Sequence, residues 1–451
     1  MNLTTALTIL QQSEYLMPQW RRWYADHLHD DPAMNLEPKT WTPKLRLIKY
    51  ICQLLFFLPM PLRLAVATNL TWPAEFVIRQ RTYGRARAKL AKLRQNGLVV
   101  ASLAGSYGKT STKTIMGHLL AGEKNILITP KSINTILGIA QVILKDLQPT
   151  HQLFIVEMGE FQRGDLAKLC DFVNPEFGVL TPIGHQHEEI LGSWENLLAE
   201  MRDYVQHFAP SKLIVAHENV PYAAEIGLAQ DTPIYGSNTQ CHYQTMNTHV
   251  SRAGTEYQVV LPDQGSVPNT AKSVPMNVFI PLYGAHQALN TLPSFWLGSQ
   301  LGVPLAALAA RGASLPFIPH RHEPHFAESN VLILDNSYNT NPQSILASLT
   351  LMDDLQPTRK IMITLGFVEQ GAAAAVRHHE LGQLLARRVD YVGLIHSPYT
   401  QDILSGFTAA GGSLNHIKVG KTQEEALAAV QSFIIAGSVV VFDGGFQEMY
   451  G

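Results

Sequence analysis

The sequence predicts an α/β fold in which a helical N-terminal region precedes two domains, each built on a parallel sheet. Apolar runs of strand length alternate with helical patterns from about residue 97 to 312 and again after residue 330, whereas residues 1–96 look helical. With 451 residues, of which 46% are hydrophobic and 16% charged, the chain is long enough to bury more than one core. We therefore predict three parts: an N-terminal region 1–96, a central domain 97–312 and a smaller, Rossmann-like C-terminal domain 313–451.

The N-terminal region is partly apolar and partly basic. An aromatic and basic segment at 7–24 precedes the apolar run Ile51–Leu70, which is long enough to span a bilayer but is interrupted by Pro59, Pro61 and Arg63. Three interpretations stay open for 51–70: a buried or self-packed helical hairpin, an anchor in the membrane interface, and a true membrane span. The basic helix expected at 79–94 suits either an anionic lipid surface or a plain solvated face.

The alternating pattern places the expected strands of both sheets. In the central domain we expect parallel strands at 98–103, 152–158, 177–183 and 212–216, antiparallel hairpins within 242–282, and a helix at 286–302. In the C-terminal domain the strands are expected at 330–335, 360–365, 391–395 and 438–442.

The stretch LVVASLAGSYGKTSTK, residues 98–113, predicts a strand, a phosphate-binding loop and a helix. Its glycines let backbone N–H groups face an anion, Lys109 is placed to reach the outer phosphates, and Thr110 offers a hydroxyl to Mg²⁺. The spacing is the shortened Gly-x-x-Gly-Lys-Thr form, because Leu103 stands where the full pattern has glycine. We predict a P-loop ATPase domain with ATP and Mg²⁺ as cofactors, and expect Lys109 to face solvent; the alternative is a glycine turn before an ordinary helix. The residues assigned to the nucleotide here are Gly105, Ser106, Gly108, Lys109, Thr110 and Ser111.

Two more polar side chains follow expected strands. Glu157, within the run Ile155–Gly159, is expected at the end of a buried strand, and His187 lies in the loop after the next strand. Together with the Thr110 hydroxyl, this carboxylate and imidazole suit a divalent ion that bridges ATP phosphates and a substrate carboxylate. A helix-capping glutamate and an exposed loop histidine are the simpler explanations for each residue alone.

These motifs together resemble the Mur ligase superfamily, most closely the branch that adds a D-Ala-D-Ala dipeptide to the peptidoglycan stem. The resemblance covers about residues 97–396 and rests on the segments 105–113, 129–135, 157–159, 184–187, 192–193, 284–290 and 335–342, together with Arg321. It implies an ATP-dependent, ADP-forming amide ligase that works through an acyl phosphate on a peptidoglycan-precursor peptide.

The resemblance also implies roles for individual residues. It assigns Lys109 and His187 to catalysis and Thr110, Glu157 and His187 to the metal. It further assigns Asn290, Arg321, Asp335 and Asn339 to the nucleotide, and Ser132, Asn134 and Thr135 to the substrate.

The sequence departs from the family pattern in three places. The lysine that the family carbamylates as an extra metal ligand is replaced by Met201, and Glu200 or Asp203 is a candidate substitute, although an acid on a helix face is the simpler interpretation. The acidic loop 366–371 is short and the ending 443–448 matches poorly. Residues 1–96 stand where the soluble dipeptide-adding enzymes carry a UDP-sugar domain.

Two other functions remain open alternatives. One is a related ligase for a folate or poly-glutamate substrate. The other is a catalytically weakened nucleotide-binding scaffold for cell-wall enzymes.

Net charge and cysteine content limit which binding partners and which cellular compartment are expected. The net charge of −2 gives no global attraction for nucleic acid, and three widely spaced cysteines without a CxxC pair argue against a disulfide framework or a zinc ribbon. We expect a cytoplasmic monomer without a signal peptide, with residues 1–96 as the candidate contact with the inner face of the membrane. Its expected partners are a small-molecule or lipid-linked peptide acceptor and an amino acid or dipeptide.

Overall fold

The computed structural model describes residues 43–54, 60–184, 191–208, 213–220, 223–262, 274–338, 340–368, 370 and 373–444. The chain divides into two compact units, with the boundary between Arg85 and Ala86. The first unit holds α3 (Pro43–Leu54) and most of α4 (Met60–Gln95). In α3, Ile48 and Cys52 are buried and lie one helical turn apart. No helix in the described ranges combines the length and the hydropathy that a membrane span requires.

The last part of α4 belongs to the second unit and packs on it. Lys89 Nζ donates to the carbonyl of Leu144 at 3.0 Å, and Arg94 Nη1 donates to the carbonyl of Val173 at 3.1 Å. Residues 79–94, where a basic helix was expected, are thus part of α4. Two of their cationic side chains, Lys89 and Arg94, bind carbonyls near the C-terminal ends of α6 and α7.

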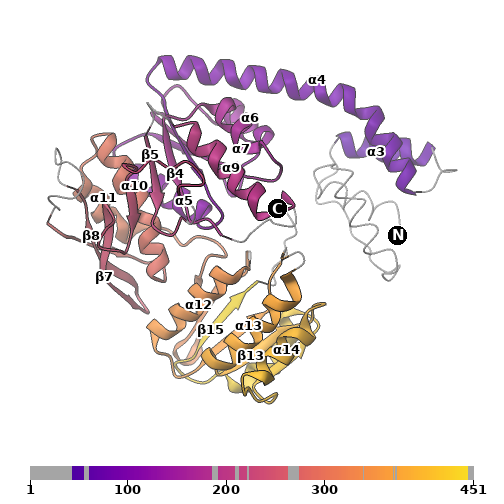
Figure 1. The fold of residues 1–451 in the computed structure, drawn as a ribbon, viewed down its shortest axis with the longest axis vertical. Helices are drawn as coiled ribbons and strands as arrows, with labels where there is room; N and C mark the ends of the chain where they lie inside the picture. The colour runs from indigo at the N-terminus through magenta and orange to yellow at the C-terminus, as the bar shows by residue number, and fades with distance from the viewer. Residues whose placement is uncertain are drawn as a thin grey trace. The chain divides into compact units, whose positions relative to one another are not determined.

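The central domain is organised around a nine-stranded sheet with the order β2-β3-β1-β4-β5-β6-β7-β8-β9 (Figure 1). The strands from β2 to β7 pair in parallel, and β7-β8-β9 form the antiparallel hairpins expected from the sequence. The strands are β1 (Val99–Ala104), β2 (Ile126–Ile128), β3 (Leu153–Glu157), β4 (Phe177–Leu180), β5 (Leu213–His217), β6 (Ile234–Gly236), β7 (Tyr243–Ser251), β8 (Gly254–Val260) and β9 (Met276–Ile280).

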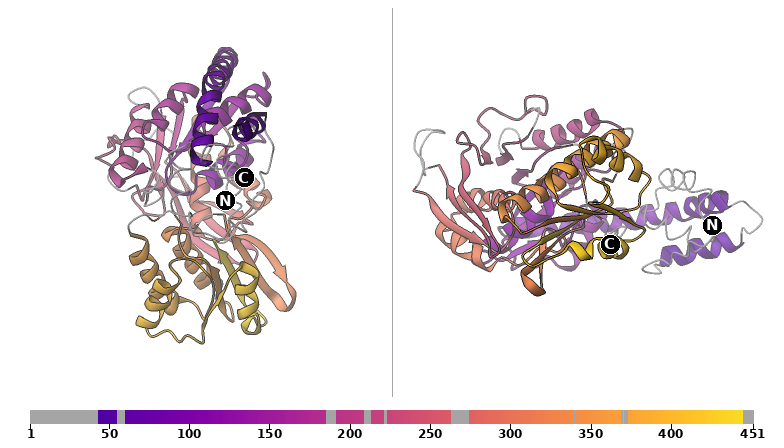
Figure 2. Two further views of the ribbon diagram at one scale, coloured as in Figure 1. Left: turned by 90° about the vertical axis from the view of Figure 1, so that its right-hand side faces the viewer. Right: turned by 90° about the horizontal axis from the view of Figure 1, so that it is seen from below.

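Helices cover both faces of this sheet (Figures 1 and 2). On one face Leu103 and Ile155 pack with Met116 and Trp296 in one core. On the other, the Tyr204 hydroxyl lies 2.9 Å from Ser102 Oγ of β1. The helices are α5 (Lys109–Leu120), α6 (Ile136–Lys145), α7 (Asp165–Val173), α9 (Trp194–Gln206), α10 (Ala285–Gln300) and α11 (Leu305–Arg311), followed by the 3₁₀ turn η1 (Gly312–Ser314).

The C-terminal domain holds a six-stranded sheet with the order β10-β11-β15-β12-β13-β14. All its pairs are parallel except β10-β11, which is antiparallel. The elements are β10 (Glu323–Ala327), η2 (Glu328–Asn330), β11 (Val331–Asn336), α12 (Pro342–Leu355), β12 (Lys360–Thr364), α13 (Ala374–Arg388), β13 (Tyr391–Ile395), α14 (Thr400–Ala409), β14 (Ile417–Gly420), α15 (Gln423–Val430), η4 (Gln431–Phe433) and β15 (Val439–Asp443).

Alternate residues of this second sheet face two separate cores. Leu332, Val439 and Val441 pack with residues of α12, α13 and α14, whereas Val440 and Phe442 pack with α15. A strand buried on both faces is the pattern of a doubly wound domain, so the predicted α/β fold class is confirmed.

Candidate nucleotide and metal site

The phosphate loop lies at the carboxyl edge of the central sheet. Strand β1 is the middle of three, between β3 and β4, and the loop at 105–108 connects its end to α5. Glu157, the last residue of β3, is in register with Leu103, so its carboxylate stands beside the loop. Strand β4 ends at Leu180, earlier than expected, and residues 181–184 form a second loop on the other side. Three strand ends therefore converge on one site, where parallel α/β sheets bind ligands.

Two positions of the phosphate loop require glycine, because a residue with a side chain would be strained or would clash there. Gly105 has φ +127°, and a Cβ there would lie 2.3 Å from Thr181 Oγ1. Gly108 has φ +78° and precedes α5 without any side-chain cap on the helix. The first N–H groups of α5 are thus left facing the loop, where the helix dipole favours an anion.

Part of the loop backbone is already hydrogen-bonded. The N–H groups of Ser106 and Tyr107 both donate to the carbonyl of Pro182, at 2.9 and 3.1 Å. Ser106 Oγ also lies 3.0 Å from the carbonyl of Gly184. These bonds tie the phosphate loop to the loop after β4.

Lys109 is buried, contrary to the expectation that it faces solvent. Its side chain is 10% exposed, and its ammonium donates to both oxygens of the Glu160 carboxylate at 2.9 and 3.0 Å. It also donates to the carbonyl of Gly105. The expectation was wrong because a P-loop pattern does not reveal that Glu160, on the neighbouring strand's loop, supplies a counter-ion in the fold.

A second buried ion pair lies next to the first. Lys113 Nζ donates to Glu157 Oε2 at 2.8 Å and to the carbonyl of Lys131, and burial lowers the pKa of the Lys113 ammonium. Thr110 Oγ1 donates to the same Glu157 oxygen at 3.0 Å. Two lysines one helical turn apart on α5 thus pair with two glutamates three residues apart, one at the end of β3 and one just after it.

This set of donors fits a nucleotide with Mg²⁺. The hydroxyl of Thr110 and the carboxylates of Glu157 and Glu160 offer the hard oxygen ligands that Mg²⁺ takes, and Lys109 offers a cation to phosphate oxygens. The uncapped start of α5 adds backbone donors beside them. His187, expected as the fourth group of this site, lies outside the described residues.

Glu200 is bound to the protein itself. Its Oε1 accepts from Arg163 Nη1 at 2.6 Å and from the N–H of Gly164, and its Oε2 accepts from the N–H of Leu166 at 2.9 Å. Asp203 accepts from the same Arg163 group at 2.5 Å. These contacts hold the N-terminus of α7 and give both acids partners within the protein. Met201 between them is fully buried.

Three other candidate residues of the central domain, Asn290, Thr135 and Asn134, make different contacts near the phosphate loop. Asn290 accepts from Thr112 Oγ1 at 3.2 Å and lies against Gly108. Thr135 caps α6, where its Oγ1 accepts from the N–H of Gly138 at 3.3 Å. Asn134 Nδ2 is 3.5 Å from Glu157 Oε1. The structure therefore brings Asn290 and Asn134 to the site and gives Thr135 a capping role.

Arg321 and Ser132 meet at Tyr338. The Arg321 guanidinium carbon lies 4.0 Å from the centroid of the Tyr338 ring, and the Tyr338 hydroxyl donates to Ser132 Oγ at 2.8 Å. Burial lowers the pKa of Arg321, while the charge of Glu157 acts in the opposite direction. Tyr338 therefore contacts both Arg321 and Ser132.

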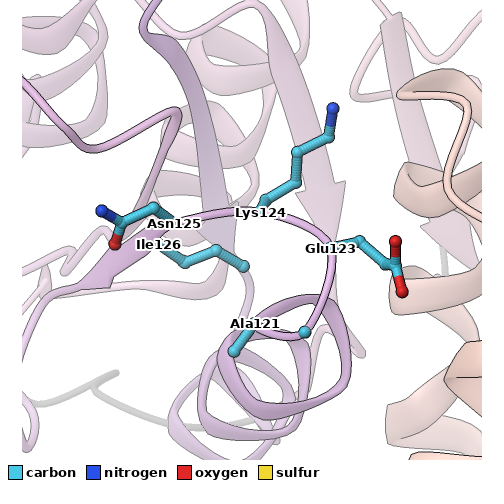
Figure 3. Close-up of a pocket in the computed structure, with 6 residues that line it drawn as sticks. Ala121, Glu123, Lys124, Asn125 and Ile126 are labelled. Carbon is cyan, nitrogen blue, oxygen red and sulfur yellow. The ribbon is translucent and has the colours of Figure 1, made fainter.

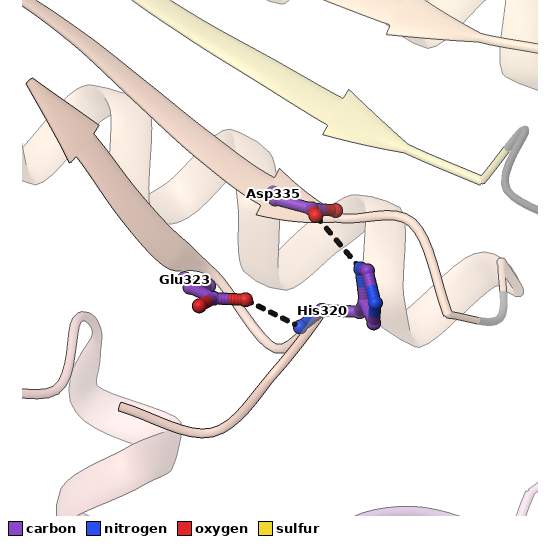
Figure 4. A group of neighbouring side chains, drawn as sticks. All are labelled: His320, Glu323 and Asp335. Carbon is purple, nitrogen blue, oxygen red and sulfur yellow. Dashed lines mark hydrogen bonds and ion pairs between the residues drawn. The ribbon is translucent and has the colours of Figure 1, made fainter. Parts of the chain in front are cut away.

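Asp335 belongs to a small cluster in the C-terminal domain (Figure 4). Its Oδ2 lies 2.7 Å from His320 Nδ1, and its Oδ1 accepts from the N–H of Ser337 at 2.9 Å. The N–H of His320 donates to Glu323 Oε2 at 3.1 Å. These contacts define the position of Asp335 at the end of β11, whereas Asn339 lies outside the described residues.

A surface hollow lies at the other end of α5 (Figure 3). It is lined by residues 121–125 of the turn between α5 and β2 and by Ile126, the first residue of β2. The phosphate loop is at the first residue of this 12-residue helix, about 18 Å away along its axis. The hollow is therefore separate from the candidate site.

Sequence reasoning missed Glu160 and Lys113. Both carried a signal, since Glu160 follows Glu157 by three residues and Lys113 follows Lys109 by one helical turn. A lysine or glutamate at such spacing is more often on a solvated face, and only the fold places both in the interior.

Comparison with known proteins adds the family. Residues 103–298 match the family described as Mur ligase middle domain, and residues 320–446 match Mur ligase, glutamate ligase domain. A UDP-N-acetylmuramoyl-tripeptide–D-alanyl-D-alanine ligase of Bacillus subtilis is 25% identical over 366 residues, which cover 79% of this chain and 76% of that protein. The Escherichia coli enzyme of the same name is 25% identical over 288 residues, 63% of this chain and 61% of that protein.

Solved structures share the fold. MurF ligase from Thermotoga maritima, solved in complex with ADP, aligns with a TM-score of 0.70 and 24% identity over 81% of this chain and 80% of that one. Folylpolyglutamate synthase of Mycobacterium tuberculosis, also with ADP, aligns with a TM-score of 0.59 and 16% identity over 83% of this chain and 95% of that one. The folate-type relative is thus the more distant of the two.

Proposed function

The chain belongs to the Mur ligase superfamily, and from that premise we propose that it is an ATP-dependent, ADP-forming ligase that joins an amine to a peptidoglycan-precursor peptide. The observation that carries this proposal is the phosphate loop at the carboxyl edge of the central sheet, where Lys109 pairs with Glu160 and Thr110 donates to Glu157. The curated relatives of the dipeptide-adding branch support the peptide as substrate class.

The reaction needs activation of a carboxylate, which is a poor electrophile. The acceptor carboxylate attacks the γ-phosphorus of ATP, ADP leaves, and the acyl phosphate then loses phosphate when the amine attacks its carbonyl carbon. Bound Mg²⁺ supplies positive charge to the phosphate oxygens in these steps. Lys109 adds a second cation, and the start of α5 orients N–H donors toward the same oxygens.

We assign the other residues by their contacts, except that His187 and Asn339, which lie outside the described residues, are assigned by the family resemblance. Thr110 and Glu157 would hold the metal, together with His187; Asn290, Arg321, Asp335 and Asn339 serve the nucleotide; Ser132 and Asn134 lie on the acceptor side. The domain boundaries at 97–312 and 313–451 remain part of this proposal, and the family matches at 103–298 and 320–446 support them.

The acceptor is proposed to be presented at an anionic membrane surface on the cytoplasmic side. Residues 43–85 carry seven basic residues against one acidic residue, Glu75, in a chain whose net charge is −2. The basic residues are Lys44, Arg46, Lys49, Arg63, Arg79, Arg81 and Arg85.

Large apolar side chains are exposed on the same two helices. Leu47, Tyr50 and Leu54 of α3 are at least half exposed, and Ile78 of α4 is 63% exposed. Exposed apolar side chains flanked by cations favour an anionic lipid interface over bulk water. A lipid-linked peptide, rather than a free UDP-linked peptide, is the acceptor that such a surface would present.

The proposed activity is tested by ADP release from purified full-length protein. ATP, Mg²⁺ and D-alanyl-D-alanine are supplied with either a UDP-linked or a lipid-linked muramyl tripeptide. We expect turnover that requires the acceptor and is faster with the lipid-linked form. ATP binding without any turnover would instead favour the scaffold alternative.

The membrane contact is tested by sedimentation with vesicles. We expect the protein to sediment with vesicles rich in phosphatidylglycerol and not with neutral phosphatidylcholine vesicles. Replacement of Lys44, Arg46 and Lys49 by glutamate should abolish sedimentation, while Lys418→Glu with Lys421→Glu, far along the chain, should not. If both variants sediment equally with these vesicles, α3 is not part of the membrane contact.

A further inference from the structure

Glu160 lies buried behind the phosphate loop. Its side chain has no exposed surface, and within the described part of the chain its ion pair is with Lys109, through both carboxylate oxygens. A carboxylate that is withdrawn from water remains ionised only while a cation or strong donors balance it.

The proposed function asks Lys109 to do something else. When ATP phosphates occupy the loop, the ammonium of Lys109 must turn toward them, because it is the loop's cation. The ammonium of Lys109 has three N–H donors, and all three are used: two donate to the Glu160 carboxylate and one to the carbonyl of Gly105. A phosphate oxygen can therefore bind Lys109 only by replacing one of these contacts. If Lys109 leaves, Glu160 faces the added negative charge of the phosphates without its counter-ion.

Glu157 does not share this difficulty. Its carboxylate is paired with Lys113, which is 1% exposed and also bound to the carbonyl of Lys131. The phosphate-loop role falls to Lys109 and not to Lys113, so the pairing of Glu157 with Lys113 does not compete with ATP phosphates. The charge of Glu160 is therefore the one that depends on the occupant of the loop.

We propose that Glu160 is a second metal-binding carboxylate of this site, which exchanges Lys109 for the Mg²⁺ of Mg·ATP as its counter-ion. The inference rests on the proposed function, since it needs ATP in the loop. A carboxylate oxygen is a hard ligand of the kind that Mg²⁺ takes, and Glu160 lies in the loop after β3, three residues beyond Glu157 at the end of that strand. Glu160 thereby makes the loop select the metal-loaded nucleotide: it opposes metal-free ATP and favours Mg·ATP.

The test compares ATP binding with and without Mg²⁺ in the full-length protein by titration calorimetry. In the wild type, Mg²⁺ should raise ATP affinity by more than about tenfold over EDTA, a factor that corresponds to one charge-assisted contact. In Glu160→Gln, metal-free ATP should bind more tightly than in the wild type, and Mg²⁺ should add less than about threefold. Glu123→Gln is the matched control, because Glu123 pairs with Arg311 at the far end of α5.

The outcomes separate this inference from the function it rests on. If the wild type binds no ATP in either condition, both the proposed function and this inference are wrong. If the wild type binds Mg·ATP and Glu160→Gln keeps the full effect of Mg²⁺, the function stands and the role of Glu160 is overturned.

A second measurement needs no nucleotide. Lys109→Met leaves Glu160 without its cation, so it should melt at a lower temperature than the double variant Lys109→Met, Glu160→Gln. Millimolar Mg²⁺ should raise the melting temperature of Lys109→Met and leave that of the double variant unchanged. A double variant that melts no higher than Lys109→Met, or an equal response of both to Mg²⁺, would contradict the exchange.

Discussion

Tyr338 and Ser132 are 206 residues apart in the sequence, yet the Tyr338 hydroxyl donates a 2.8 Å hydrogen bond to Ser132 Oγ. The same ring lies under the guanidinium of Arg321, at 4.0 Å from its centroid. One aromatic side chain therefore joins a residue after β2 to a residue before β10.

The two contacts of Tyr338 predict different effects for two variants. Tyr338→Phe keeps the ring and should lower kcat/KM for ligation by no more than about fivefold, since it removes one neutral hydrogen bond. Tyr338→Ala also removes the cation–π contact and should lower kcat/KM by about tenfold or more. The measurement is ADP release at varied ATP. If Phe were as damaging as Ala, the ring would not position Arg321.

The buried pair of Lys113 and Glu157 predicts a loss of stability. Lys113→Met leaves the Glu157 carboxylate, 2% exposed, without its cation and should lower the free energy of unfolding by about 3 kcal/mol. Urea unfolding followed by circular dichroism measures this. The control is Lys92→Met on the exposed side of α4, which should change stability by less than about 0.5 kcal/mol. If Lys113→Met and Lys92→Met lose similar free energy of unfolding, the Lys113–Glu157 ion pair does not stabilise the fold.

Glu157 also predicts a metal requirement. Glu157→Gln keeps the size of the side chain but removes one anionic ligand, so the Mg²⁺ concentration for half-maximal ADP release should rise by about tenfold or more. Titration of Mg²⁺ at fixed, saturating ATP measures it. An unchanged Mg²⁺ dependence would place the metal elsewhere.

Two histidines predict the response of stability to acid. The rings of His286 and His322 lie 5.1 Å apart; burial lowers the pKa of His286 to about 4 and that of His322 well below its ordinary value. The unfolded chain binds these protons near pH 6.5 and the folded chain does not, so stability is full above pH 6.5 and falls as the pH drops toward 4.

For His286, a pKa lowered from 6.5 to about 4 corresponds to about 3 kcal/mol of stability, of which about 2 kcal/mol is lost by pH 5. Melting temperatures between pH 7.5 and 5 should fall steeply in the wild type and less in His286→Asn with His322→Gln. Gln can still donate to Ser348 Oγ, which His322 Nε2 contacts at 2.8 Å. Parallel pH curves for the wild type and the variant would show that other groups control acid unfolding.

The sequence predicts the sheets better than their edges. The runs that became β1, β3, β11 and β15 are continuous and apolar because both of their faces are buried, which is a strong local signal. β2 (Ile126–Ile128) carries no such signal because it is only three residues long, and the antiparallel β10 carries none because most of its residues are exposed.

The site shows the same division. Glycine spacing and strand-end position identify Gly105, Thr110 and Glu157 from local pattern alone. The pairing of Lys109 with Glu160 could not be predicted in this way, since it depends on β3 lying next to β1 and on both side chains turning inward. The same holds for Tyr338 and Ser132, which only the three-dimensional fold brings together.

The measurement that tests the account most directly is the mass of the ligated product. Purified protein is incubated with ATP, Mg²⁺, D-alanyl-D-alanine and a lipid-linked or UDP-linked muramyl tripeptide, and the muramyl peptide is analysed by mass spectrometry beside the ADP released. The account predicts that the muramyl peptide gains the mass of the dipeptide less one water, with one ADP formed per bond, and that Lys109→Met forms neither. Tight ATP binding with an unchanged muramyl peptide, or a mass gain that does not require ATP, would contradict it.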